Sequence, residues 1–148
     1  ATYIEISIEA QHMWYYEDGQ LYMDTDVVTG KGGNHTKRGV GYIHNKARNA
    51  TLVGADYVSF VKYWMKVWGG IGIHDASWRS QFGGKIYLTS GSHGCINTPL
   101  DNVIKLYNRV KIGTPFPYEA LAGEKRRQTL ERMTHMQEDA VRALLHQP

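Results

Sequence analysis

The chain has 148 residues, the length of a single domain that can bury a core without disulfides or metals. Its hydrophobic fraction of 42% and aromatic fraction of 11% are typical of a globular protein and argue against disorder. The formal net charge of +3 is mild and the basic residues are scattered, so a nucleic-acid binder is not expected. No apolar run approaches the roughly 18 residues that a membrane span needs. The single cysteine excludes an internal disulfide and a zinc site built from several cysteines.

The N-terminal part of the chain is predicted to form strands. Residues 3–8 alternate apolar and polar side chains, the pattern of a half-buried strand. Residues 11–16 and the segment from Leu21 onward form a predicted hairpin around an Asp18-Gly19 turn. Further strands are predicted at 26–29 and 39–43, separated by a glycine-rich loop at 30–34, whereas the polar stretch 45–58 is predicted to be a loop.

The second part of the chain adds helices. Residues 61–68 are rich in aromatic side chains, and the apolar spacing of 100–107 predicts a helix with Thr98 as its cap and Pro99 in its first turn. A last strand is predicted after Pro115. We expect a mainly β sandwich or barrel-like catalytic domain over 1–118, with one helix after the cysteine loop. Residues 119–148 are predicted to be a C-terminal extension that forms an amphipathic helix.

The candidate chemistry lies between His74 and Asn97, and its centre is Cys95. A thiol attacks only as the thiolate, so a reactive cysteine needs a base such as His74 or His93. The turn at Gly94 brings backbone N–H groups together where they could stabilise an oxyanion, which favours His93 as a positioning residue and His74 as the base. The ring of His74 would be oriented either by the side chain of the following aspartate or by its backbone carbonyl.

Two other interpretations of these residues were considered. A single cysteine is usually a buried, inert side chain, but small and polar residues surround Cys95 in this sequence. A metal site made of His74, His93 and Cys95 is disfavoured, because the two ligands at 93 and 95 are only two residues apart and no fourth ligand is apparent.

His74, a spacer of seventeen residues and the run Ser92-His93-Gly94-Cys95-Ile96-Asn97 resemble the signature of the L,D-transpeptidase (YkuD-type) family. Segments 11–16, 63–65, 72–75 and 113–115 are also similar to Gram-positive members, so the resemblance covers about residues 3–117. It departs from the family at Thr36-Lys37-Arg38-Gly39, where members often carry Thr-Pro-x-Gly. The region beyond Pro117 has no counterpart in the family.

The resemblance implies the following roles. Cys95 would attack the third residue of a peptidoglycan tetrapeptide stem and expel the terminal D-alanine, with His74 as base and then acid. The thioester would be captured by a second stem to give a 3→3 cross-link, without metal or organic cofactor. Backbone N–H groups of His93, Gly94 and Cys95 would form the oxyanion hole. The remaining implied site residues are Ser92, which orients the loop, and, for substrate binding, Asn97, Asp75 and the lid residues Tyr63 and Trp64.

The resemblance also implies acylation of Cys95 by carbapenems and a location on the wall side of the membrane. Arg79 and Tyr87 lie in the spacer; an arginine there could meet a stem carboxylate, but we expect Arg79 to be exposed to solvent. Two other functions stay open at this stage. One is an L,D-carboxypeptidase, in which water captures the thioester, and the other is a wall-binding module without catalysis.

Overall fold

The computed structural model describes residues 2–33, 39–68, 71–119 and 135. Within these residues nine strands form two open sheets, so the predicted mainly β class is confirmed and the sheets do not close into a barrel. The five-stranded sheet has the order β3-β2-β1-β9-β4, and the four-stranded sheet has the order β5-β6-β7-β8. The strands are β1 (Tyr3–Ser7), β2 (His12–Glu17), β3 (Gln20–Asp26), β4 (Gly39–Tyr42), β5 (Asn45–Val53), β6 (Val58–Trp68), β7 (Ile71–Asp75), β8 (Ile96–Thr98) and β9 (Pro115–Glu119).

The predicted hairpin at the start of the chain is present as β2 and β3. Its turn places Asp18 at φ 50° and Gly19 at φ 80°, the left-handed pair that a two-residue turn between twisted strands requires. β1 pairs antiparallel with β2 and parallel with β9, so the last described strand returns to the middle of the first sheet. The alternation over 3–8 predicted the strand correctly but not its burial, because all five residues of β1 are buried and the strand is not half-buried.

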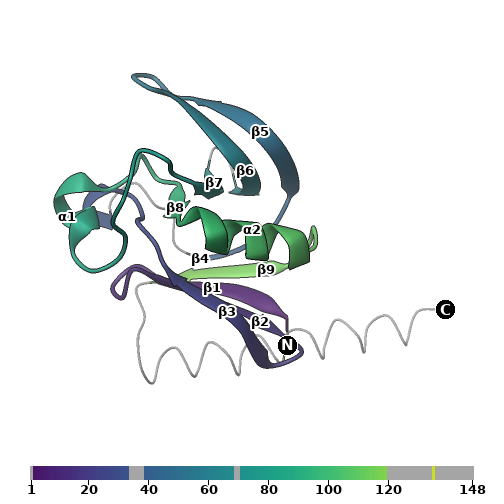
Figure 1. The fold of residues 1–148 in the computed structure, drawn as a ribbon. Helices are drawn as coiled ribbons and strands as arrows, with labels where there is room; N and C mark the ends of the chain where they lie inside the picture. The colour runs from purple at the N-terminus through teal and green to yellow at the C-terminus, as the bar shows by residue number, and fades with distance from the viewer. Residues whose placement is uncertain (1, 34–38, 69–70, 120–134, 136–148) are drawn as a thin grey trace.

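The prediction of a loop over 45–58 was wrong, because residues 45–53 form β5. This strand pairs with β6 from Asn45 to Val53 with a break at Asn49, and the two extend as a long hairpin beyond the rest of their sheet (Figure 1). Side chains of β5 are exposed or half-buried, with no buried position among its nine residues. A strand that no second layer covers has no reason to alternate apolar and polar residues, so its sequence resembles a loop.

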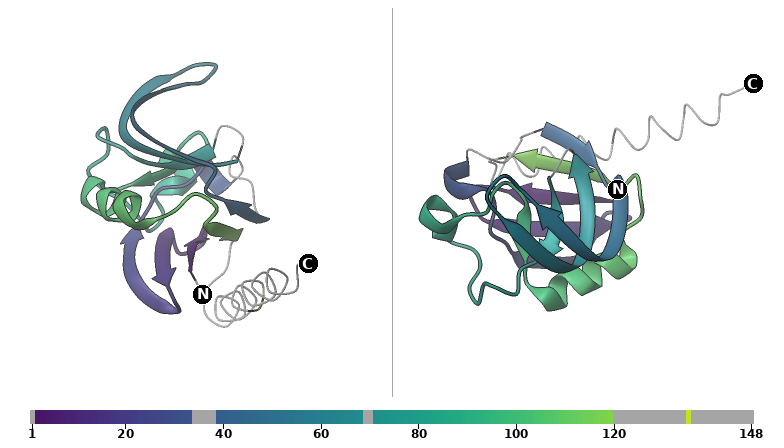
Figure 2. Two further views of the ribbon diagram at one scale, coloured as in Figure 1. Left: turned by 90° about the vertical axis from the view of Figure 1, so that its right-hand side faces the viewer. Right: turned by 90° about the horizontal axis from the view of Figure 1, so that it is seen from above.

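The hydrophobic core lies between the two sheets and is closed on one side by α2 (Leu100–Arg109), as two further views show (Figure 2). α2 contacts β3 of the first sheet and β6 and β7 of the second. Residues of all three layers are fully or almost fully buried there, among them Ile4, Ile6, Met13, Met65, Ile73, Ile96, Val103 and Leu106. The predicted helix after the cysteine loop is thus confirmed, and it holds the two sheets together.

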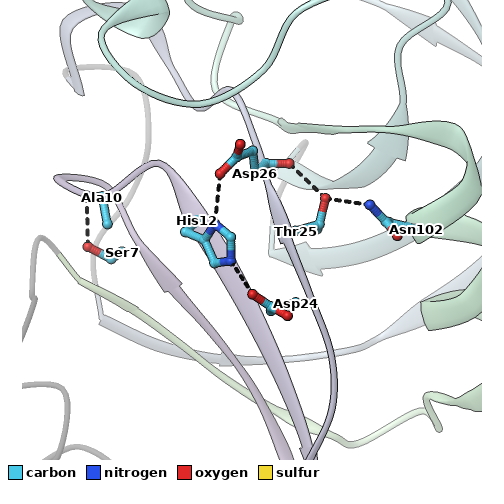
Figure 3. A network of polar contacts seen from close by, with 7 residues as sticks. All are labelled: Ser7, Ala10, His12, Asp24, Thr25, Asp26 and Asn102. Carbon is cyan, nitrogen blue, oxygen red and sulfur yellow. Dashed lines mark hydrogen bonds and ion pairs between the residues drawn. The ribbon is translucent and has the colours of Figure 1, made fainter.

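Polar side chains fix α2 against β3 (Figure 3). The Thr25 hydroxyl accepts a hydrogen bond from the Asn102 amide at 2.8 Å and donates to the Asp26 carbonyl. Next to it, the two ring nitrogens of His12 lie 2.8 Å from the Asp26 carboxylate and 2.7 Å from that of Asp24. The bond between Thr25 and Asn102 therefore ties β3 to the helix that follows β8.

The ends of α2 differ from the predicted ones. Thr98 belongs to β8, where its hydroxyl donates to the Ile96 carbonyl, and the N-cap position is occupied by Pro99. At the other end the Lys46 ammonium donates to the carbonyls of Tyr107 and Val110, at 2.6 and 2.9 Å. A lysine from β5 therefore satisfies carbonyls that a helix end leaves without partners.

Two short helical segments were not predicted: η1 (Lys31–Gly33) and α1 (Ile86–Ser90), which contact each other. The predicted amphipathic helix, and with it nearly all of the 119–148 extension, lies outside the described residues. Among the described residues no helix has the length and apolar character needed to cross a bilayer.

Candidate active site

A cavity of about 190 Å³ lies where β7, β8 and the loop before β8 meet the β5–β6 hairpin. Five of the predicted site residues line it: His74, Ser92, His93, Cys95 and Asn97. The parallel pairing of β7 with β8 brings them together, because it sets Ile73 opposite Ile96 and His74 opposite Asn97. Residues that are 23 positions apart in sequence thereby become neighbours.

Cys95 lies immediately before β8 and is partly buried in the cavity. Burial raises the pKa of its thiol above the ordinary value of 9.0, and a hydrogen bond from the Gly72 backbone partly opposes this effect. At neutral pH the cysteine is therefore a neutral thiol. Nucleophilic attack requires that a nearby base takes its proton.

His74 has the geometry of such a base. Its Nδ1 lies 2.6 Å from the backbone carbonyl of Asp75, and a carbonyl only accepts hydrogen bonds, so Nδ1 carries the proton and Nε2 is left as the acceptor. Of the two orienting groups considered from the sequence, the structure selects the carbonyl. Burial lowers the pKa of His74 below 6.5, so the imidazole is neutral at physiological pH.

Two indole rings enclose His74. The centroids of the Trp64 and Trp78 rings both lie 5.9 Å from that of the imidazole. Trp64 also lies over Gly72, where an added Cβ would come within 2.8 Å of the indole. A glycine two positions before His74 therefore allows the tryptophan to cover this part of β7.

The loop before β8 is held by Ser92. The Ser92 hydroxyl accepts a hydrogen bond from the Gly94 N–H at 3.1 Å and donates to the Cys95 carbonyl. Backbone bonds join Ser92 to Thr29 and Lys31, so the loop is fixed to a neighbouring segment. Gly94 has φ 129°, which favours glycine. The Gly94 N–H donates to Ser92, so the predicted oxyanion hole depends on the backbone N–H groups of His93 and Cys95. The oxyanion hole stays a prediction.

His93 faces the β5–β6 hairpin. Its ring stacks on Tyr57 with centroids 4.2 Å apart, and its Nε2 is 4.0 Å from the Asp56 carboxylate. The side chain of His93 is 62% exposed, in contrast to buried His74. His93 thus connects the cysteine loop to the hairpin tip, which fits the predicted positioning role.

Three cavity residues from the hairpin were missed by the sequence analysis: Leu52, Tyr57 and Ser59. All three lie in or next to the stretch that was interpreted as a loop. The glycine at position 54 is the one sequence signal for a close contact near Tyr57. A Cβ on Gly54 would lie 2.0 Å from the tyrosine ring, so only glycine leaves room for the ring. The tip of the hairpin is therefore built around this aromatic ring.

The predicted substrate-binding residues Tyr63, Trp64 and Asp75 are not among the residues that line the cavity. Tyr63 packs against the core and against Tyr107, and Trp64 covers His74. The buried carboxylate of Asp75 accepts hydrogen bonds from the backbone N–H groups of Lys62 and Tyr63. A role of these residues in binding substrate stays a prediction; in the structure they support β6 and β7.

Trp78 and Arg79 also line the cavity, and neither was assigned to the site from the sequence. The expectation that Arg79 is exposed was wrong, since its side chain is half-buried and its Nε is fully buried. Its guanidinium lowers the pKa of His74, which places its charge close to the candidate base.

Among the described residues, no three His, Cys, Asp or Glu side chains come close enough to hold a metal, so the structure gives the metal-site alternative no support.

Comparisons with known proteins agree on the family. The family model of the L,D-transpeptidase catalytic domain matches residues 1–117. The crystal structure of a Cys-to-Ser mutant of Enterococcus faecium L,D-transpeptidase is 47% identical, with a TM-score of 0.76, and the match covers 79% of this chain and 49% of that chain. No curated protein matches.

Two further solved structures are similar. One is the catalytic domain of the E. faecium enzyme acylated by ertapenem, 47% identical with a TM-score of 0.71, where the match covers 79% of this chain and 95% of that one. The other is an L,D-transpeptidase from Stackebrandtia nassauensis, 26% identical with a TM-score of 0.65, covering 79% and 54%. This chain thus spans about half the length of the E. faecium mutant chain. It belongs to the L,D-transpeptidase catalytic-domain family.

Proposed function

We propose that the chain is the catalytic domain of a peptidoglycan L,D-transpeptidase that uses Cys95 as its nucleophile and forms 3→3 cross-links. One observation carries the proposal: a cavity holds both a cysteine and a histidine whose Nε2 is available to accept a proton. The ertapenem acyl-enzyme of a 47% identical catalytic domain supports the assignment of acyl-transfer chemistry.

In the first half-reaction, Nε2 of His74 takes the Cys95 proton as the thiolate adds to the carbonyl carbon of the third stem residue. The tetrahedral intermediate expels the terminal D-alanine. The C–N bond breaks, and the leaving amine receives the proton from His74. Backbone N–H groups of the loop that Ser92 holds stabilise the oxyanion. The product is a thioester between Cys95 and the shortened stem.

In the second half-reaction, the side-chain amine of another stem's third residue attacks the thioester carbonyl. His74 accepts the proton of the amine as the amide bond forms, the C–S bond breaks, and His74 returns that proton to the Cys95 sulfur. The hairpin that reaches His93 through Tyr57 limits the entry of water, which would otherwise hydrolyse the thioester. Peptidoglycan stems as partners, and a location on the wall side of the membrane, are parts of this proposal.

The test is incubation of the wild type and of Cys95→Ala with a disaccharide tetrapeptide, followed by mass spectrometry of the products. Cross-linked dimer and D-alanine from the wild type alone are expected. Release of D-alanine with tripeptide and no dimer would instead establish an L,D-carboxypeptidase. Absence of both products from a folded wild type would contradict the proposal and favour a wall-binding module.

An independent test uses a carbapenem. Intact-protein mass spectrometry should show the wild type gaining the mass of one carbapenem molecule, through opening of the β-lactam ring by the Cys95 thiolate. Cys95→Ala should gain none. Labelling of the Cys95→Ala variant would show that another residue reacts.

A further inference from the structure

Arg79 lies between two neighbouring hollows of the surface. One is the cavity that contains Cys95, and the other has a volume of about 410 Å³. Both are lined by Trp78 and Arg79, and the second hollow is completed by Ser80, Gln81, Ile86, Thr89 and Ser90. Arg79 is therefore part of the wall that a stem peptide bound next to Cys95 would meet.

The charge of Arg79 has no counterion within the described part of the chain. Its buried Nε has no hydrogen-bond partner there, and no described carboxylate lies within 4.0 Å of its guanidinium. Arg109 provides the contrast, since it forms a two-point ion pair with Glu17. Burial without a partner lowers the pKa of Arg79, which reflects the cost of removing the guanidinium from water.

A planar guanidinium of this kind matches a carboxylate, which it can bind through two parallel hydrogen bonds. A tetrapeptide stem ends in the α-carboxylate of its terminal D-residue. That group lies one residue beyond the carbonyl that Cys95 attacks, and successive Cα atoms are about 3.8 Å apart. A stem whose attacked carbonyl is at Cys95 therefore places its terminal carboxylate within the same small cavity, where Arg79 forms part of the wall.

We propose that Arg79 binds the terminal carboxylate of the donor stem and thereby selects stems that end one residue beyond the attacked carbonyl. This inference rests on the proposed function, because it takes the donor to be a tetrapeptide. Binding of the carboxylate supplies a counterion that none of the described residues provides, and it fixes the scissile bond at Cys95. Departure of the D-residue removes the carboxylate together with the leaving amine.

The test measures binding, so that it does not depend on turnover. The 148-residue chain carrying Cys95→Ala is titrated with a tetrapeptide stem that ends in a carboxylate and with the same stem ending in a carboxamide. The carboxylate form should bind more tightly. Adding Arg79→Gln should weaken binding of the carboxylate form by about 10- to 100-fold and leave the carboxamide form unchanged. Arg79→Lys should recover part of the difference.

Lys85→Gln is the matched control. It removes one positive charge from an exposed position near the second hollow without lining it, so both stems should bind as before. Equal preference for the carboxylate in the Cys95→Ala protein with and without Arg79→Gln, with both folded by circular dichroism, would overturn the inference. In otherwise wild-type protein that turns the stem over, Arg79→Gln should raise KM for the carboxylate stem much more than it changes kcat. Failure of the proposed function would appear separately, as wild-type protein that binds the stem but forms no product.

Discussion

Replacement of Asp75 tests how the β5–β6 hairpin is held to the rest of its sheet. The pairing of β6 with β7 runs from Trp68 to Trp64, and Asp75 follows His74 at its end. Beyond that point the Asp75 carboxylate accepts the N–H of Lys62 at 2.9 and 3.0 Å and the N–H of Tyr63 at 2.9 Å. A buried side chain thus continues the hydrogen bonding of β6 into the base of the hairpin.

The expected cost of Asp75→Ala follows from these two donors. A hydrogen bond to a charged group contributes about 1.5–3 kcal/mol, and a donor left without an acceptor costs a similar amount. Since both N–H groups are only partly buried, water replaces part of the loss. We therefore expect the free energy of unfolding to fall by about 2–4 kcal/mol. Asp75→Asn keeps one acceptor oxygen but turns an NH₂ group toward a donor, so its effect should be about half as large.

Urea denaturation gives the free energy of unfolding, and hydrogen exchange of the Lys62 and Tyr63 amides reports on the hairpin directly. Both amides should exchange faster in Asp75→Ala than in the wild type. Asp101→Ala is the control, because this exposed aspartate in the first turn of α2 should contribute less than about 1 kcal/mol. Unchanged exchange of the two amides, together with a loss of stability no greater than that of the control, would refute the reasoning.

Three further predictions concern the hairpin, the base and the helix. Gly54→Ala places a Cβ 2.0 Å from the Tyr57 ring, so the ring should leave its stacked position and carbapenem acylation, followed by intact-protein mass spectrometry, should slow several-fold. The acylation rate constant is measured from about pH 5 to about pH 10. As the pH is lowered, the rate constant should fall with a midpoint below pH 6.5, because burial lowers the pKa of the base His74, which must be neutral to accept a proton. A second change in the rate constant, from ionisation of the Cys95 thiol, should come above pH 9.0, because burial raises the pKa of that thiol. A fall in the rate constant with a midpoint above pH 6.5 would contradict the assignment of His74 as the base. Lys46→Met removes two hydrogen bonds to carbonyls at the end of α2 and should cost about 1–3 kcal/mol in thermal or urea denaturation, and no loss would mean that water replaces the ammonium.

The elements that the sequence predicted well are those whose apolar side chains pack into the core. Alternation over 3–8 predicted β1, and apolar spacing over 100–107 predicted α2, whose buried residues are Val103 and Leu106. β1 was expected to be half-buried, but all five of its residues are buried. β5 gave no such signal, since none of its nine residues is buried and its order comes from pairing with β6. The backbone of β5 is also irregular at Asn49, which has φ 56° and no place in the register with β6.

The sequence by itself determined the family and the local site, because the run from Ser92 to Asn97 is contiguous and its residues remain neighbours in any fold. Only the tertiary structure decided which groups surround Cys95. The parallel pairing of β7 with β8 places His74 beside it, and the hairpin brings Tyr57 onto His93. Contacts of this kind depend on strand pairing between segments far apart in the chain, which local spacing does not specify. Arg79 is the clearest case, since the burial of its Nε and its place in the cavity wall follow from the packing around it.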